Sequence, residues 1–276
     1  MHTIRFILPL TFVLVLQSSA SAQMEYPLSA AAAESGEVFV ADRYLPGIWK
    51  IVGGKRSLLF QGSKKYRTPL NAIRCVVMDR SGALIAGDTA TREVYRFDDS
   101  NNPVPLTNGG IGMPMSVAVN SKGELLVADL ELHRIWRVPA AGGQPEPLAD
   151  VQAPRGVVCD ADDNVWVVAQ GGKDQVVRIT PSGQVQVVVA GRPFQFPHNI
   201  ALAADNTAYV TDGFAKAVWR IPKSGKPEKW VAGDPLINPV GLAWRQKNLM
   251  VVDPHAKAVF EITPEGRLQR LEATTD

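Results

Sequence analysis

Four polar residues occupy positions where they could share a binding or catalytic site: Arg74, Arg155, His198 and Asn199. Guanidinium groups bind carboxylates and phosphates through paired hydrogen bonds, and an imidazole can transfer a proton near neutral pH. The residues at the equivalent positions of the other repeats described below include no carboxylate. We therefore expect a basic site for an anionic ligand, with His198 as the candidate residue for acid–base catalysis.

An aspartate also recurs at a nearly constant interval, and carboxylates are common metal ligands. Spacings of 46, 41, 41, 42 and 41 residues separate six anchor positions, which are Asp42, Asp88, Asp129, Gln170, Asp212 and Asp253. A metal site is built from different residues contributed by different repeats, whereas the aspartate has a copy in almost every repeat. We expect each aspartate to accept hydrogen bonds from backbone N–H groups of the turn that follows it, with Gln170 doing part of the same job.

The interval reveals six copies of one unit. Two apolar residues, such as Ile135-Trp136, follow six and seven residues after each anchor, and glycine turns separate short apolar stretches. In the third unit these stretches are 116–119, 124–128, 134–138 and a weaker 144–148. A fixed period of about forty residues with four short strands in each unit is typical of a β-propeller. The sequence predicts an all-β, six-bladed β-propeller with four-stranded antiparallel blades.

The first strand of each blade must position the polar residues. In a propeller this strand lines the central channel, and the loops before it and after the second strand lie on one face of the disc. The four polar residues would then surround the mouth of the channel, with Asn71 in a turn-rich insertion just before the second blade. Such a basic funnel favours a carboxylate, a phosphate or an acidic sugar. The alternative is that the arginines are solvated or paired with Glu131, Asp150 and Asp174.

The chain termini bear on ring closure. We expect blade 6 to pack against blade 1 without a shared strand; the alternative is that residues 24–27 add an edge strand to blade 6. Cys75 and Cys159 are expected to remain unbridged, because they occupy different registers in repeats two units apart.

The N-terminus is typical of a secretory signal peptide. A basic start precedes the apolar run 6–16, and Ala20-Ser21-Ala22 matches the pattern that signal peptidase cleaves. We expect residues 1–22 to be removed and residues 23–276 to form a single propeller domain, secreted or periplasmic, with no transmembrane segment after cleavage. We also expect a monomer, and the net charge of +2 does not favour nucleic acid as a partner.

The third unit, from Pro114 through Gly123 and Asp129 to Ile135, resembles an NHL repeat, and the chain from Met24 onward is similar to the NHL and gluconolactonase (senescence marker protein) group of six-bladed propellers. That group holds a divalent metal, usually calcium, at the channel mouth. The resemblance implies Glu25, Asn71 and Asn199 as possible ligands, but Arg155 stands where the group has its aspartate. The virginiamycin B lyase group is also similar and uses a histidine in a Pro-His-Gly sequence. Pro197-His198-Asn199 matches it in part, and Thr211-Asp212 replaces the usual glutamate.

Two functions follow as hypotheses. The first is an exported NHL-type propeller that binds a ligand or acts as a scaffold, without a cofactor, using Asn71, Arg74, Arg155, His198 and Asn199. Its partner would be an anionic small molecule, a sugar acid or a protein. The alternative is a lactonase-like hydrolase or a lyase that uses the channel-mouth residues, with or without calcium.

Overall fold

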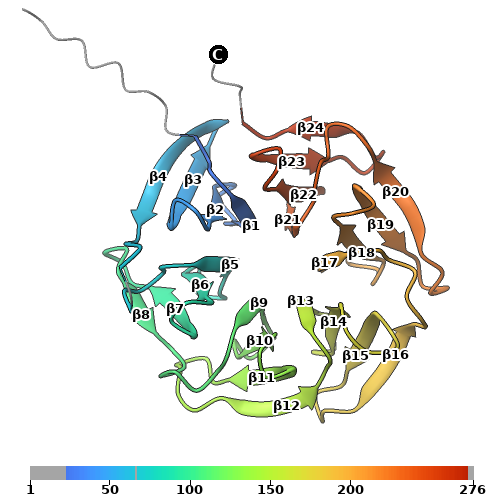
Figure 1. Ribbon diagram of the computed structural model, residues 1–276, viewed down its shortest axis with the longest axis horizontal. Coiled ribbons are helices and arrows are strands. Elements are labelled where there is room, and N and C mark those ends of the chain that lie inside the picture. The colour runs from blue at the N-terminus through green and yellow to red at the C-terminus, as the bar shows by residue number, and fades with distance from the viewer. Residues whose placement is uncertain (1–22, 66, 273–276) are drawn as a thin grey trace, which may run out of the picture.

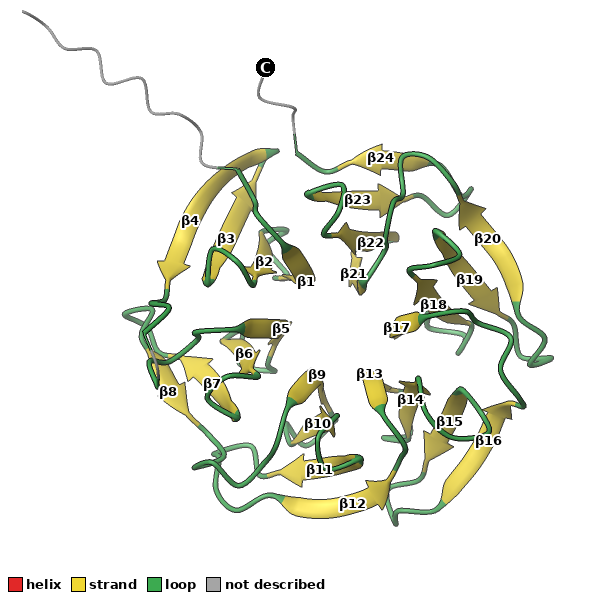
Figure 2. Cartoon of the chain, viewed as in Figure 1, coloured by secondary structure: helices red, strands yellow, loops and turns green. Residues whose placement is uncertain are grey.

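Six four-stranded antiparallel sheets surround a central axis in the computed structural model, which describes residues 23–65 and 67–272 (Figure 1). Strands and loops account for all of these residues (Figure 2), so none of the described segments forms a helix that could cross a membrane. The prediction of an all-β six-bladed propeller is confirmed. The expected signal peptide, 1–22, lies outside the described residues.

Each blade takes its four strands from one continuous stretch of chain, ordered from the axis to the rim (Figure 1). Blade 1 consists of β1 (Pro27–Ala32), β2 (Val38–Asp42), β3 (Gly47–Val52) and β4 (Lys55–Gln61). Blade 2 consists of β5 (Ile73–Met78), β6 (Leu84–Asp88), β7 (Glu93–Phe97) and β8 (Pro103–Pro105). Blade 3 consists of β9 (Pro114–Val119), β10 (Leu125–Asp129), β11 (Arg134–Val138) and β12 (Glu146–Asp150). Blade 4 consists of β13 (Pro154–Cys159), β14 (Val165–Ala169), β15 (Val176–Ile179) and β16 (Val185–Val189). Blade 5 consists of β17 (Pro197–Leu202), β18 (Ala208–Asp212), β19 (Ala217–Ile221) and β20 (Glu228–Ala232). Blade 6 consists of β21 (Gly241–Arg245), β22 (Asn248–Asp253), β23 (Ala258–Ile262) and β24 (Leu268–Arg270).

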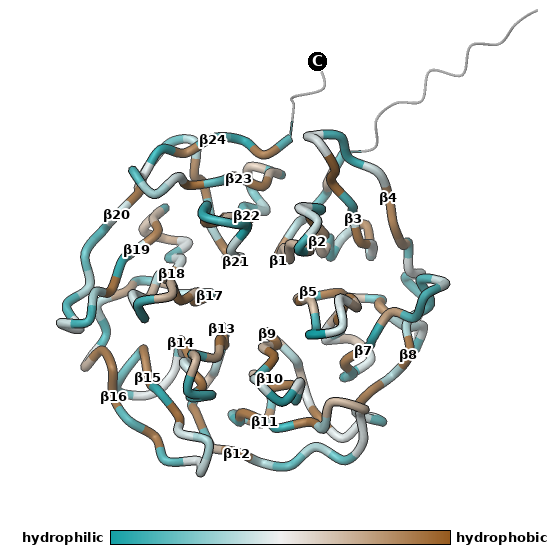
Figure 3. Tube along the Cα trace, turned by 180° about the vertical axis from the view of Figure 1, so that it is seen from behind, coloured by the Kyte–Doolittle hydropathy of each residue, from teal (hydrophilic) through white to brown (hydrophobic). Residues whose placement is uncertain are grey.

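The hydrophobic core is divided into six layers, one between each pair of neighbouring blades. Between blades 3 and 4, for example, Leu126 and Ile135 pack with Val157 and Val167. The second strand of each blade is covered on both faces, which explains why these strands are almost wholly apolar. Hydrophilic residues gather in the turns, and the outermost strands mix hydrophilic with hydrophobic residues (Figure 3).

The ring closes by packing, as predicted. Val38 and Trp49 of blade 1 share a core layer with Met250 and Val259 of blade 6. Arg56 on β4 also forms an ion pair with Glu272, just beyond β24. The alternative for residues 24–27 is wrong, because Pro27 opens β1 and pairs with Asp42 in blade 1.

The five recurring aspartates are fully buried turn anchors. The Asp129 carboxylate accepts hydrogen bonds from the N–H groups of Glu131 (3.0 Å) and Leu132 (3.1 Å) in its own turn, which confirms the prediction. It also accepts two from the loop before β9, donated by Gly112 (2.7 Å) and Met113 (3.0 Å). Each aspartate thus joins the two loops of its blade on the mouth face.

Gln170 differs from the predicted anchor. Its side chain donates to the carbonyl oxygen of Pro197 in blade 5, at 2.8 Å, instead of binding its own turn. In blade 4 a backbone hydrogen bond from Gln170 N–H to Ala153 joins the two loops (3.0 Å). Cys75 and Cys159 are free, as expected, although Cys159 is only partly buried.

Candidate functional site

A β-bulge at the start of the innermost strand aims the candidate residues at the mouth. In five blades the pairing of the first two strands skips a position, and blade 6 lacks this irregularity. A bulged residue leaves the ladder and turns its side chain away from the regular alternation. The residues left out of the ladder are Leu28, Arg74, Met115, Arg155, and His198 with Asn199.

The structure brings Arg74, Arg155 and His198 together electrostatically; we call these three residues the basic cluster. Burial, followed by repulsion from Arg155 and Arg43, lowers the pKa of the Arg74 guanidinium to about 10. Burial also lowers the pKa of Arg155. Burial and the charges of Arg74 and Arg155 lower the pKa of His198 from 6.5 to about 3. The imidazole is therefore neutral at neutral pH, within a positive field.

Several polar atoms of the basic cluster lack protein partners. Arg155 Nε and both ring nitrogens of His198 are buried without a hydrogen bond. A buried polar atom without a partner is costly, and native structures keep few of them. These atoms are therefore the clearest sign of a ligand site in the described part of the chain.

The acids expected as alternative partners of the arginines are engaged elsewhere. Glu131 forms an ion pair with Arg92 at 2.6 Å, and Asp150 forms one with Arg134 at 2.7 Å. Asp174 accepts a hydrogen bond from the N–H of Gly191. Among residues 23–65 and 67–272, no acid forms an ion pair with either arginine of the basic cluster.

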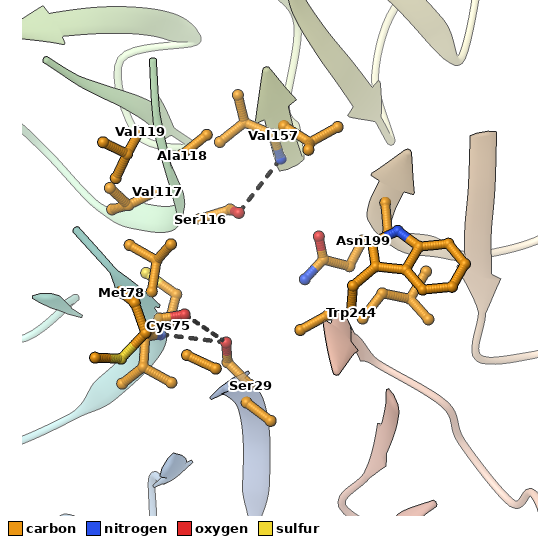
Figure 4. A pocket seen from close by; sticks show the side chains of 18 of the residues that line it. Ser29, Cys75, Met78, Ser116, Val117, Ala118, Val119, Val157, Asn199 and Trp244 are labelled. Atoms are coloured by element: carbon orange, nitrogen blue, oxygen red, sulfur yellow. Dashed lines mark hydrogen bonds between the residues drawn. The ribbon is translucent and has the colours of Figure 1, made fainter. Parts of the chain in front are cut away.

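Asn199 lines the channel next to the basic cluster. It borders a cavity of about 320 Å³ formed by the innermost strands of all six blades, and its side chain points toward the middle of that space (Figure 4). Its Oδ1 accepts from the N–H of Ile200 at 2.8 Å. A Cβ at Gly156 would lie 2.6 Å from the Cα of Asn199, so this glycine allows the two inner strands to approach.

The other predicted ligands have different surroundings. Asn71 lies in the loop before β5, where its side chain donates to the carbonyl oxygen of Lys65 at 2.8 Å. Glu25 is exposed and lines a surface hollow with Tyr26, Tyr44 and His255. Among the described residues, no cluster of three or more His, Cys, Asp or Glu side chains could hold a metal. Calcium binding by Glu25, Asn71 and Asn199 stays a prediction.

Aromatic residues beside the basic cluster were missed in the sequence. The ring of Phe196 meets that of His198 edge-on, with centroids 4.8 Å apart, and stacks on Phe214 at 4.6 Å. Tyr26, in the loop before β1 on the mouth face, stacks on Tyr44 at 4.4 Å. The sequence feature that could have indicated these aromatic residues is the loop position two residues after the anchor, which Tyr44 and Phe214 occupy in their blades.

Asn238, in the loop before β21, was also missed. A Cβ at Gly213 would lie 2.1 Å from Asn238 Oδ1 and 3.1 Å from His198 Nε2, so both side chains pack against this glycine. Any larger residue at position 213 would displace one of them. Gly213 thus keeps His198 and a neutral amide on the same side of the mouth.

This arrangement suits the binding of negative charge. Two guanidinium groups and an imidazole with free nitrogens can donate several hydrogen bonds to one acidic group. The neutral imidazole could also accept a proton, although a pKa of about 3 makes it a weak base until a bound anion offsets the arginine charges. The same positive field opposes a divalent cation beside the basic cluster.

Comparison with known proteins adds the family. Among solved structures, the virginiamycin B lyase of Staphylococcus aureus superposes with a TM-score of 0.70 at 16% identity, covering 93% of this chain and 87% of that chain. A gluconolactonase of Xanthomonas campestris superposes with a TM-score of 0.74 at 14% identity, covering 90% and 87%. At these identities the likeness shows the fold alone.

No curated protein matches the chain by sequence. The sequence model of the virginiamycin B lyase family, however, matches residues 76–276. That stretch includes four complete blades, most of a fifth, and both Arg155 and His198. This chain therefore belongs to the virginiamycin B lyase family.

Proposed function

We propose that this protein binds a small anionic ligand at the mouth of the propeller, through Arg74, Arg155 and His198. The observation that carries this proposal is the unpartnered state of Arg155 Nε and of both His198 nitrogens beside a second unpaired arginine. An acidic ligand would supply acceptors for Arg155 Nε and for the one N–H of the neutral His198 ring, and it would offset the mutual repulsion of the arginines. Asn199 and Asn71 are proposed to contact the same ligand from the channel wall and from the loop before β5.

The test is a calorimetric and thermal-shift screen of carboxylates, phosphate and sugar acids against the mature chain and an Arg155→Gln variant. We expect at least one anion to bind, more weakly at high salt, and to lose about ten-fold or more in affinity in the variant. Arg267→Gln is the matched control, because Arg267 is an exposed arginine on the opposite face of the disc. Equal binding by Arg155→Gln and the wild type would reject the proposal.

A second candidate function is a lyase or lactone hydrolase at the same mouth. The family match and the placement of a neutral, unpartnered histidine there favour it. The virginiamycin B lyase of Staphylococcus aureus has been solved, as a catalytically inactive variant, with quinupristin. Quinupristin is therefore the first substrate to test, along with simple lactones. A lyase cleaves without adding water and a hydrolase adds one, so product masses distinguish the two, and His198→Asn should abolish either.

The exported state is part of the proposal. The composition of residues 1–22 supports a cleaved signal peptide and a secreted or periplasmic protein. That the protein is a monomer and works without a cofactor is likewise part of the proposal. N-terminal sequencing of the exported protein should begin at Gln23. A protein that retains Met1 in the cytoplasm would reject export without affecting the ligand proposal.

A further inference from the structure

The loops around the mouth divide it into two chemically different sectors. Two residues after each anchor, aromatic side chains occur in blades 5, 6 and 1, and non-aromatic ones in blades 2, 3 and 4. In blade order these residues are Tyr44, Ala90, Glu131, Gly172, Phe214 and His255. The three aromatic blades are contiguous, since blade 6 packs against blade 1. Both arginines of the basic cluster come from the other half, from blades 2 and 4.

The aromatic rings form a continuous surface from the basic cluster to solvent. Phe196 contacts His198 edge-on and lies nearly parallel to Phe214, with 13° between their planes. Phe214 is 69% exposed, more than any other large apolar side chain among the described residues. The stack thus connects the buried, unpartnered ring of His198 to an aromatic face that is open to solvent.

The loops of the mouth face carry five of the ten large apolar side chains that are exposed among the described residues, and the other five lie on the two outer strands of their blades. Besides Phe214, the loops of the mouth face expose four large apolar side chains, which are Tyr44 (53%), Met113 (37%), Leu132 (48%) and Ile237 (44%). Exposed apolar groups next to unpaired cations are typical of a site that takes an amphiphilic ligand. A wholly polar anion such as a sugar acid would leave the Phe196–Phe214 stack in water.

We propose that the mouth selects anions that carry a flat aromatic group, with the acidic group on the basic cluster and the ring against Phe196 and Phe214. This inference rests on the proposed function and names its ligand class. The ring distances favour this ligand class, because only Phe196 lies between His198 and Phe214, with centroid distances of 4.8 Å and 4.6 Å. A ligand with a short spacer between its acidic group and its ring could therefore contact His198 and Phe214 together. Offset stacking on an exposed ring adds affinity that a sugar acid cannot obtain.

Three probes test the inference on the mature chain: 3-phenylpropionate, its neutral amide, and gluconate, an anion without a ring. Isothermal titration should give 3-phenylpropionate an affinity at least about five-fold above that of either other probe. Phe214→Ala should remove that advantage and leave gluconate binding unchanged. Because Phe214 is mostly exposed, this variant should fold, which circular dichroism checks, and Phe214→Tyr should restore the preference.

Leu132→Ala is the matched control, since Leu132 is an exposed apolar residue in the equivalent loop of blade 3, outside the aromatic sector. Equal affinities for 3-phenylpropionate and gluconate, or an unchanged preference in Phe214→Ala, would overturn the aromatic inference and leave anion binding standing. If Arg155→Gln binds both anions as well as the wild type does, the proposed function fails too. Tight binding of the neutral amide would also overturn the inference, because the acid would then contribute nothing.

Discussion

The ring of anchoring aspartates and the ring of bulged residues lie on the same face of the disc, and they differ in how far their polar groups are satisfied. Asp129 is buried, and its carboxylate accepts five hydrogen bonds, including one from the indole of Trp136 at 2.8 Å. Arg155 and His198 have buried nitrogens with no partner. Each aspartate serves its own blade, whereas the bulged residues face one another across the mouth.

This difference distinguishes polar residues that stabilise the fold from polar residues that are available to bind a ligand. A residue type repeated in almost every blade with its hydrogen bonds complete stabilises the repeat. A position whose residue type differs between the blades, and whose polar atoms lack hydrogen-bond partners, is a candidate for binding a ligand.

Asp129→Asn should cause the largest effect. The change removes the charge and turns an amide group toward backbone N–H donors that have no other acceptor, so we expect unfolding free energy to fall by about 3–5 kcal/mol. Urea denaturation followed by tryptophan fluorescence measures it. Asp150→Asn is the control: its side chain is exposed in an ion pair with Arg134, so the loss should stay below about 1 kcal/mol. Equal losses in the two variants would remove the distinction between anchor and surface aspartates.

His198→Asn should change the acid stability of the protein. The folded pKa of His198 is about 3, below its unfolded value of 6.5, so only the unfolded chain takes up this proton between those values. Stability from this group is complete above pH 6.5 and is lost as the pH falls toward 3. We expect the wild type to lose about 2–3 kcal/mol more than His198→Asn between pH 7 and pH 4.

The matched control is Leu132→Ala, which removes an exposed apolar side chain from the mouth face and should keep the wild-type slope. Urea denaturation at a series of pH values gives the three curves. If His198→Asn and the wild type lose stability in parallel, His198 is not held in a positive, desolvated site.

Arg155→Gln should stabilise the protein modestly while it weakens anion binding. Removing a half-buried cation that repels Arg74 and His198 should raise the unfolding free energy by about 1 kcal/mol. Scanning calorimetry without ligand measures the gain, and Arg267→Gln should show none. A destabilised Arg155→Gln would mean that Arg155 supports the fold, as the aspartates do.

Calcium should have the smallest effect. The positive charges at the mouth oppose a divalent cation, so we expect millimolar calcium to shift the melting temperature by less than about 1 °C. A calcium-dependent rise that Glu25→Gln abolishes would instead support the metal alternative with Asn71 and Asn199.

The repeat could be predicted from the sequence because its signals are local. Strand alternation, glycine turns and the aspartate that binds its own turn all recur within about forty residues of chain, as in 124–129. The grouping of Arg74, Arg155 and His198 could be predicted once the blades were counted, since each stands at the opening of an inner strand. The bulges that aim them, and the unpaired state of their nitrogens, depend on contacts between blades.

Other features of the site depended on packing that no local pattern encodes. Gln170 looked like a substitute anchor, yet its longer side chain reaches Pro197 in the next blade. The stack of Phe196 on Phe214 joins residues eighteen positions apart, in the loops before β17 and after β18. The order of loop residues around the ring could have revealed the aromatic sector, because the predicted packing of blade 6 against blade 1 already made blades 5, 6 and 1 neighbours.

The most direct test of the central claim is to locate an anion by its anomalous scattering. Crystals of the mature chain soaked in millimolar bromide should show an anomalous peak within hydrogen-bond distance of the Arg155 guanidinium and His198, and Arg155→Gln crystals should lack it. A mouth without bromide in the wild type, or a calcium ion bound there from a mixed soak, would contradict the claim that the unpaired cations form an anion site.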